Sequence, residues 1–193
     1  MSFDTLFEFE QALSKYTGAP YVVLTDGCTH AIELAMRYYH VRECQFTAYT
    51  YLSVPQMIGQ LSIKYNLLDE PWTGEYRFHG TNIWDSARRL EPNMYRFGQV
   101  QCLSFGNTKP LQIGKVGAIL LDDVVAYKKL SRMRSDGRDL RISPWTNQQR
   151  FCSGYHYCPT LEDCSRGLEL LKTVVPQCQA ATYPDCRKLS IGC

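Results

Sequence analysis

Residues 21–39 read YVVLTDGCTHAIELAMRYY and contain the unit that decides the fold. The β-branched run at 21–25 predicts a short buried strand. Apolar side chains then recur at helical spacing over roughly 28–39, and Gly27 lies at the turn between the two segments. A strand that enters a helix through a glycine turn predicts an α/β protein. The free N–H groups at the start of such a helix form a candidate anion site, although many turns of this kind bind nothing.

Similar periodicities continue on both sides of this unit. They predict helices at 5–16, 123–135 and 159–175, a strand edge and a short helix within 45–63, and strands near 82–85, 99–105 and 116–121. Residues 66–82 are rich in turn formers, and we expect them to be irregular. The length of 193 residues suits one full-sized domain, alone or with a small appendage.

The composition is that of an ordinary globular protein, with 45% hydrophobic and 21% charged residues. A net charge of +2 gives no reason to expect a nucleic-acid surface or binding to an anionic membrane. The longest apolar run, 116–121, is far shorter than a membrane span. The N-terminal residues lack the pattern of a secretory or transit peptide, so we expect a cytoplasmic location.

Nine cysteines occur, and none of them forms a CxxC pair. Six lie in the last quarter of the chain: Cys152, Cys158, Cys164, Cys178, Cys186 and Cys193. A zinc site built from the first three with His156 stays open as an alternative, but their six-residue spacing suits no common zinc motif. We therefore expect free, reduced thiols and no bound metal.

Two further segments contain side chains that could take part in chemistry. Residues 83–90, IWDSARRL, place Asp85 at the end of a buried-looking strand, where it could cap a helix, bind a metal or pair with a cationic ring nitrogen. Residues 104–120, SFGNTKPLQIGKVGAIL, place Ser104 and Lys109 in a loop between two strands. A lysine in a dry pocket can form a Schiff base. Taken singly, these segments favour the ordinary explanations, a cap for Asp85 and a loop lysine for Lys109.

Together, in this order, the segments resemble the DegT/StrS-type sugar aminotransferase family. These are pyridoxal 5′-phosphate (PLP) enzymes of the aspartate aminotransferase fold, fold type I. The most specific piece is Ser-Phe-x-x-Thr-Lys with its Gly-x-x-Gly-Ala tail. Residues 46–58, FTAYTYLSVPQMI, are similar to the family's aromatic segment, and residues 154–171, GYHYCPTLEDCSRGLELL, to its Gly-Tyr-Asn-Tyr-Arg-Met-Thr stretch and following helix.

The resemblance implies an α/β fold, namely a trimmed fold type I large domain with a mixed, mostly parallel sheet flanked by helices. Family members are considerably longer, and most of their C-terminal domain has no counterpart here. We expect a PLP-binding core over residues 1–142. Residues 143–193 would supply an interface loop, a helix and a cysteine-rich tail in place of that domain.

The resemblance also implies catalytic roles. Lys109 would bind PLP as a Schiff base and move a proton between the substrate carbon and the cofactor. Asp85 would pair with the pyridinium nitrogen and keep it protonated, so that the ring accepts electrons. Tyr51 would stack on the cofactor ring.

Five residues would complete the cofactor site. Gly27, Cys28 and Ser104 would hold the phosphate, and Arg88 would contact the ring hydroxyl. His156 would reach the phosphate of the neighbouring subunit's cofactor, which implies a homodimer with shared active sites.

Four positions depart from the family pattern. Arg88 replaces glutamine, Cys28 replaces threonine and His156 replaces asparagine. Asp26 replaces serine beside the phosphate, where a carboxylate would repel the cofactor unless it caps the helix.

The implied function is a PLP-dependent aminotransferase that cycles between PLP and pyridoxamine 5′-phosphate (PMP). It would move an amino group from an amino acid, glutamate or glutamine, to a keto-sugar nucleotide. A PLP-binding protein without turnover, or a partner subunit of another aminotransferase, is the alternative. A Cys/His metal-binding or structural protein is a third hypothesis.

Overall fold

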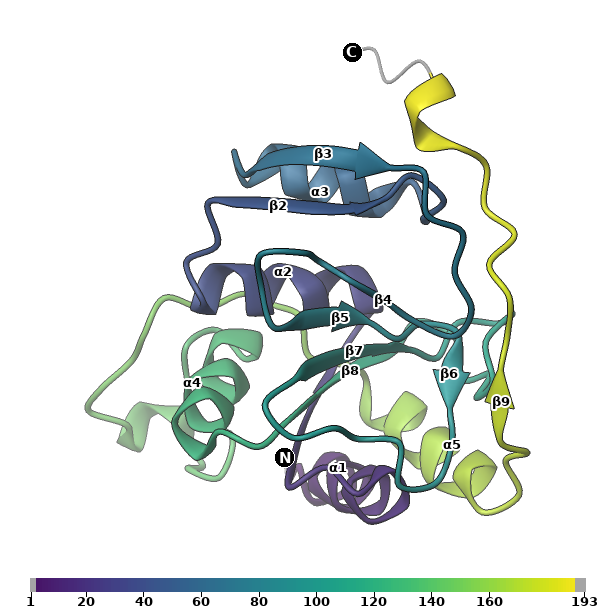
Figure 1. The fold of residues 1–193 in the computed structure, drawn as a ribbon. Helices are drawn as coiled ribbons and strands as arrows, with labels where there is room; N and C mark the ends of the chain where they lie inside the picture. Colours follow the sequence, from purple (N-terminus) through teal and green to yellow (C-terminus); the bar gives the residue numbers. More distant parts are fainter. Residues whose placement is uncertain (1–2, 190–193) are drawn as a thin grey trace.

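A five-stranded mixed sheet lies at the centre of the computed structural model, which describes residues 3–189 (Figure 1). The strand order is β1 (Tyr21–Thr25), β8 (Gly117–Leu121), β7 (Val100–Ser104), β5 (Ile83–Asp85) and β4 (Tyr76–Arg77). The predicted strands near 21–25, 82–85, 99–105 and 116–121 are confirmed, and they form four of these five strands.

The directions of the strands correct one expectation. β5 and β7 pair in parallel, whereas β8 pairs antiparallel with both β1 and β7, and β4 pairs antiparallel with β5. The mixed sheet is confirmed. Three of its five strands, β1, β5 and β7, point the same way, but only β5 and β7 are parallel neighbours. Most of the hydrogen-bonded pairs are antiparallel because β8 returns between β1 and β7.

A second, two-stranded sheet lies beside the first. β2 (Glu43–Thr47) and β3 (Lys64–Leu68) pair in parallel, with α3 (Ser53–Gln60) connecting them. An isolated antiparallel bridge joins Gln45 of β2 to His79, just beyond β4. The strand edge and short helix expected within 45–63 are therefore confirmed. The expectation that 66–82 is irregular is wrong in part, because it includes most of β3 and all of β4.

Helices cover both faces of the central sheet (Figure 1). α1 (Asp4–Thr17) and α5 (Leu161–Leu171) pack together on one face, and α2 (Cys28–Tyr38) and α4 (Val124–Arg134) pack on the other. Alternate residues of β1 and β8 enter the two apolar cores, as expected for strands buried on both sides. These four helices were all predicted, and their ends lie within a few residues of those expected. Helix α5 is capped at its N-terminus by Thr160, whose Oγ1 accepts a hydrogen bond from Asp163 N at 3.1 Å.

A buried ion pair joins three of these elements. Arg134, at the end of α4, donates to Glu10 Oε1 of α1 at 2.6 Å and to the carbonyl oxygen of Leu24 in β1 at 3.0 Å. Leu24 N donates to the same carboxylate at 3.0 Å. The two side chains satisfy each other where neither could reach water.

The chain after α5 runs back along the edge of the molecule (Figure 1). Its strand β9 (Gln177–Cys178) pairs antiparallel with β6 (Arg89–Leu90), and a short 3-10 helix η2 (Cys186–Lys188) follows. Another 3-10 turn, η1 (Trp145–Asn147), lies in the loop before α5. The domain boundary expected at residue 142 stays a prediction.

The eight cysteines within residues 3–189 are free thiols, and Cys193 lies outside the described residues. In the same range, no three His, Cys, Asp or Glu side chains come together as a metal site, and this includes the proposed set of Cys152, Cys158, Cys164 and His156. No helix within residues 3–189 has the length and apolar character needed to cross a bilayer.

Candidate active site

A cavity of about 610 Å³ opens where the N-terminus of α2 meets the ends of β5 and β7 and the loop between β7 and β8. It has the size typical of small-ligand pockets. Six of the eight predicted site residues line it: Gly27, Cys28, Tyr51, Asp85, Ser104 and Lys109.

The N-terminus of α2 faces the cavity without a cap. No described side chain caps this helix, so the N–H groups of its first turn, from Cys28 to His30, have no helical partner. A Cβ at Gly117 of β8 would lie 2.5 Å from the backbone N of Cys28. Glycine there lets the helix end approach β8 closely. The result is a row of free backbone donors that can hold an anion.

Asp26 does not cap α2 but pairs with a neighbour. Its Oδ1 lies 2.5 Å from Nδ1 of His30, one turn along the helix, and His30 also lines the cavity. The His30 ring stacks on Tyr157 with centroids 3.7 Å apart, and Asp26 N donates to the carbonyl oxygen of Tyr157 at 2.8 Å. The contact engages one oxygen of the carboxylate beside the helix end.

Asp85 is 4% exposed and ends β5 at the cavity wall. Its Oδ1 accepts from Ala87 N at 2.9 Å, and its Oδ2 accepts from the Tyr76 hydroxyl at 3.0 Å. Burial raises the pKa of this carboxyl above its ordinary value, although those hydrogen bonds and the charge of Lys109 act in the opposite direction. No cation among residues 3–189 forms an ion pair with it, so a buried carboxylate faces the cavity without a counter-ion.

Cys28 offers a neutral thiol. Burial, and the nearby charge of Asp85, raise its pKa well above the ordinary value. The sulfur donates weakly toward Asp85 Oδ1 at 3.9 Å and the carbonyl oxygen of Cys102 at 3.7 Å. The backbone N–H of Cys28, rather than its side chain, is therefore the group suited to an anion.

Lys109 is 8% exposed and enters the cavity from the loop between β7 and β8. Its backbone N donates to the carbonyl oxygen of Gly106 at 2.9 Å, which tightens the turn that presents the side chain. Its Nζ donates to the Tyr183 hydroxyl at 2.6 Å. A buried amine is thus aimed into the same space as the Asp85 carboxylate.

Aromatic side chains form one wall. Tyr183 lies between Tyr51, with ring centroids 6.1 Å apart, and Trp72, with centroids 6.3 Å apart and planes inclined by 26°. Tyr51 is 62% exposed, which leaves much of its ring free to cover a ligand.

Two predicted residues lie elsewhere. Arg88 does not line the cavity; its guanidinium reaches Gln179 Oε1 at 3.3 Å and Thr182 Oγ1 at 3.4 Å. His156 points away, with 88% of its side chain exposed and its Nδ1 3.1 Å from Asp136 Oδ1. The sequence analysis missed His30, Trp72 and Tyr183. For His30 the signal was its four-residue spacing from Asp26, whereas Tyr183 lies 74 residues from Lys109 and gave none.

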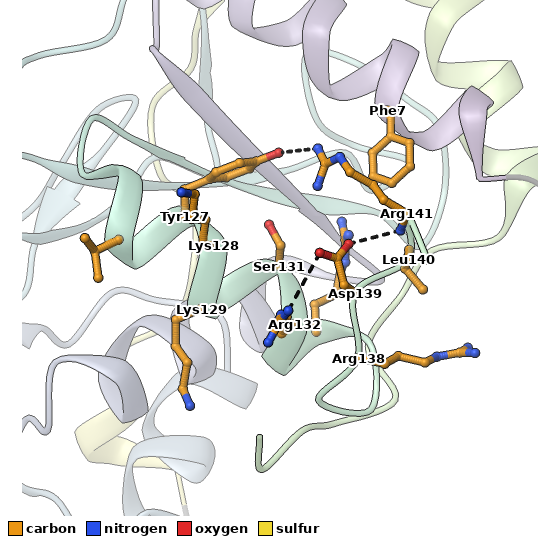
Figure 2. Close-up of a pocket in the computed structure, with 12 residues that line it drawn as sticks. Phe7, Tyr127, Lys128, Lys129, Ser131, Arg132, Arg138, Asp139, Leu140 and Arg141 are labelled. Carbon is orange, nitrogen blue, oxygen red and sulfur yellow. Dashed lines mark hydrogen bonds and ion pairs between the residues drawn. The ribbon is translucent and has the colours of Figure 1, made fainter. Parts of the chain in front are cut away.

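A second cavity of about 590 Å³ lies between α4, the 138–141 loop and Phe7. Figure 2 shows that Lys129 and Arg138 point in different directions there. Arg141 donates to the Tyr127 hydroxyl at 2.9 Å, and Arg132 lies 3.8 Å from Asp139. Its cations thus spread apart or pair with neighbours, so this cavity lacks the buried reactive amine found in the first.

Comparisons with known proteins agree with this geometry. The profile of the DegT/DnrJ/EryC1/StrS aminotransferase family matches residues 2–70. No curated protein sequence matches the chain. Among solved structures, AtS13 from Actinomadura melliaura is similar over 89% of this chain and 60% of its own, with 18% identity and a TM-score of 0.75. The sugar aminotransferase CalS13 from Micromonospora echinospora is similar over 88% and 60%, with 18% identity and a TM-score of 0.73.

Spr1654 from Streptococcus pneumoniae, in its PMP form, is similar over 88% of this chain and 59% of its own, with 17% identity and a TM-score of 0.70. The chain thus spans about 60% of the length of these solved structures. It has the fold of PLP aminotransferase large domains, with a mixed sheet between helices. The chain is thus similar to the DegT/DnrJ/EryC1/StrS aminotransferase family over residues 2–70, and its fold is that of the large domains of solved members.

Proposed function

We propose that the chain binds PLP in the Lys109 cavity and transfers an amino group from glutamate or glutamine to a keto-sugar nucleotide. One observation carries the proposal. The buried amine of Lys109, the buried carboxylate of Asp85 and the uncapped N-terminus of α2 face the same cavity. They supply the three partners that PLP requires: an amine, an acid for the ring nitrogen and a phosphate site.

The residues present fit PLP on two counts. Asp85 is a buried carboxylate without a counter-ion, and a protonated ring nitrogen would offset the cost of burying it. A Cβ placed on Gly27 would meet nothing within 4 Å, which leaves open space beside the free N–H groups of α2. A phosphate there would gain both the donors and the favourable end of the helix dipole.

Bound PLP would supply a carbonyl group that condenses with amines and a ring that accepts electrons. Lys109 Nζ would hold the cofactor covalently and move a proton at the reacting carbon. Asp85 would keep the ring nitrogen protonated. Tyr51 would cover the ring face, while Ser104 and the backbone of Gly27 and Cys28 would hold the phosphate.

A homodimer with shared sites is part of the proposal. His156 is turned to solvent rather than to the cavity of its own chain, which supports a role in a neighbouring subunit's site. The nucleotide-sugar substrate is proposed from the family and from relatives such as the sugar aminotransferase CalS13.

One observation favours the alternative, PLP binding without turnover or as a partner subunit. Arg88, expected at the ring hydroxyl, is held outside the cavity by Gln179 and Thr182. A site that lacks this donor would hold PLP but tune its electronic state less well.

The test is the visible absorbance of the protein with added PLP, before and after glutamate or glutamine. Wild type is compared with Lys109→Ala and with Lys115→Ala, a lysine that lines the same cavity. We expect a band of covalently bound PLP that requires Lys109 but not Lys115, and that converts to the PMP spectrum with the donor. A band that neither donor changes would support the alternative. Absence of a band in wild type would contradict the assignment of PLP.

A further inference from the structure

The segment of residues 177–188 brings Tyr183 to the Lys109 cavity and is attached to the rest of the protein both before and after this residue. On one side, β9 pairs with β6, Gly74 N donates to the carbonyl oxygen of Gln179 at 2.8 Å, and Ala181 N donates to that of Trp72 at 3.1 Å. These backbone hydrogen bonds belong to a two-residue strand pairing and an adjacent isolated bridge between Thr73 and Ala180, and they set the register of the segment.

The second attachment follows Tyr183 in the sequence. Cys186 is 3% exposed; its N donates to the carbonyl oxygen of Ala48 at 2.9 Å, and its sulfur donates to that of Thr50 at 3.4 Å. Arg187 lies 3.5 Å from Asp69. A buried thiol and an ion pair therefore fix the segment to the chain next to α3.

The body of the protein is shaped to receive this segment. Gly74 has φ of +74°, and a Cβ placed on it would lie 2.4 Å from the sulfur of Cys178. Any other residue would be strained at this positive φ, and its Cβ would clash with Cys178 of β9. The fit indicates a built contact and gives Cys178 a structural role.

Tyr183 lies between the two attachments and faces Lys109. The Arg88 guanidinium lies 5.0 Å from the centroid of its ring, Trp72 stacks beside it, and its hydroxyl accepts the 2.6 Å hydrogen bond from Lys109 Nζ. The ring is thus fixed before any ligand arrives. This also accounts for the position of Arg88, which supports Tyr183 from outside the cavity.

We propose that the 177–188 segment is a wall of the cavity, and that Tyr183 is a positioning residue that holds the ε-amine of Lys109 inside it. The proposal rests on the proposed function only in one respect, namely that PLP is the carbonyl compound that Lys109 binds. A lysine side chain has many rotamers, and a fixed hydroxyl partner limits the amine to those that face the cavity. The segment would therefore complete the site from a part of the chain far from its other residues.

The test measures acetylation of Lys109 by an N-hydroxysuccinimide ester in the absence of PLP. Peptide mass spectrometry gives the labelling rate of Lys109 relative to Lys115, an exposed lysine at the same cavity that normalises for the amount of active reagent. Tyr183→Phe keeps the ring and removes the hydroxyl. Tyr127→Phe is the matched control, since it removes a hydroxyl that accepts from Arg141 at 2.9 Å outside the cavity.

We expect the Lys109-to-Lys115 ratio to rise about two- to tenfold in Tyr183→Phe, because one hydrogen bond no longer holds the amine. The ratio should stay at the wild-type value in Tyr127→Phe. An unchanged ratio in a folded Tyr183→Phe variant would overturn the proposal.

A reciprocal measurement covers the case in which Tyr183→Phe fails to fold. Nitration of Tyr183 by tetranitromethane should be slower in Lys109→Met than in wild type, because the reagent attacks the phenolate and the Lys109 ammonium that donates to this oxygen favours that form. Equal rates would overturn the proposal. Neither measurement uses PLP, so a missing PLP band would contradict the proposed function and leave the Tyr183 contact standing.

Discussion

Asp26 Oδ1 lies 2.5 Å from Nδ1 of His30, at the uncapped end of α2. The carboxylate would otherwise repel a phosphate bound to the same helix end, since like charges this close interact strongly away from bulk water. His30 also stacks on Tyr157, which fixes its ring at the edge of the cavity. His30 thus gives a hydrogen-bond partner to a carboxylate that looks unfavourable from the sequence.

Replacing His30 tests this arrangement. We expect His30→Ala to weaken PLP binding about tenfold, because Asp26 is left unpaired beside the phosphate. Binding of pyridoxal, which lacks the phosphate, should change little. His79→Ala is the control. Its Nε2 lies 3.1 Å from Glu70 Oε2, and neither residue lines the cavity. Absorbance titration with both ligands gives the affinities, and equal losses for PLP and pyridoxal would contradict the assignment.

Asp85→Asn should stabilise the cofactor-free protein and weaken its binding of PLP. Burial holds the pKa of Asp85 above its unfolded-state value, so ionisation of this carboxyl opposes folding. The penalty is absent below the ordinary pKa of aspartate and complete once the pH exceeds the folded-state pKa. We expect a gain in stability near neutral pH that vanishes in acid.

Thermal denaturation with and without PLP, at neutral and acidic pH, checks this prediction. The account would be contradicted if Asp85→Asn lowered stability at neutral pH, or bound PLP as tightly as wild type.

Gly117→Ala should disturb the phosphate end of the cavity. Its Cβ would lie 2.5 Å from the backbone of Cys28 and Gly27, so α2 must move away from β8. We expect a loss of about 1–3 kcal/mol in unfolding free energy, together with weaker PLP binding. Gly59→Ala, in α3, is the control because its Cβ would meet nothing within 4 Å. Urea denaturation gives both stabilities, and similar values would show that the close approach is not needed.

Arg134→Met should destabilise the fold without touching the cavity. Arg134 is 1% exposed and pairs with Glu10, which would be left as a buried carboxylate without a cation. We expect a loss of about 3–5 kcal/mol. Lys172→Met removes an exposed pair with Glu169 and should cost less than about 1 kcal/mol. The same denaturation measurement compares the two, and comparable losses would contradict the role given to the buried pair.

Much of the fold could be predicted from local patterns, because β1, α2 and α5 carry strong periodicity and clear turns or caps. Strand β3 could not. Its residues Lys64–Leu68 are exposed or half-buried and show no alternation, and pairing with β2 is what makes them a strand. The antiparallel pairing of β8 with β1 and β7 could not be predicted either, because it depends on contacts between segments that are distant in the sequence.

The residues of the candidate site could likewise be predicted only in part. Lys109 and Asp85 could be predicted because short motifs mark them, and the structure brings them to one cavity. Tyr183 could not, since only the path of the 177–188 segment brings it to Lys109. The expected place of Arg88 at the ring hydroxyl is not where the structure puts its side chain, because that segment offers it Gln179 and Thr182.

The most direct test of the central claim is to incubate the protein with PLP, reduce it with borohydride and map the modified lysine by peptide mass spectrometry. We predict one modified peptide, containing Lys109, and none in Lys109→Ala. Modification at Lys115 or an exposed residue such as Lys172 to the same extent as Lys109, or no modification, would contradict a cofactor site built on Lys109.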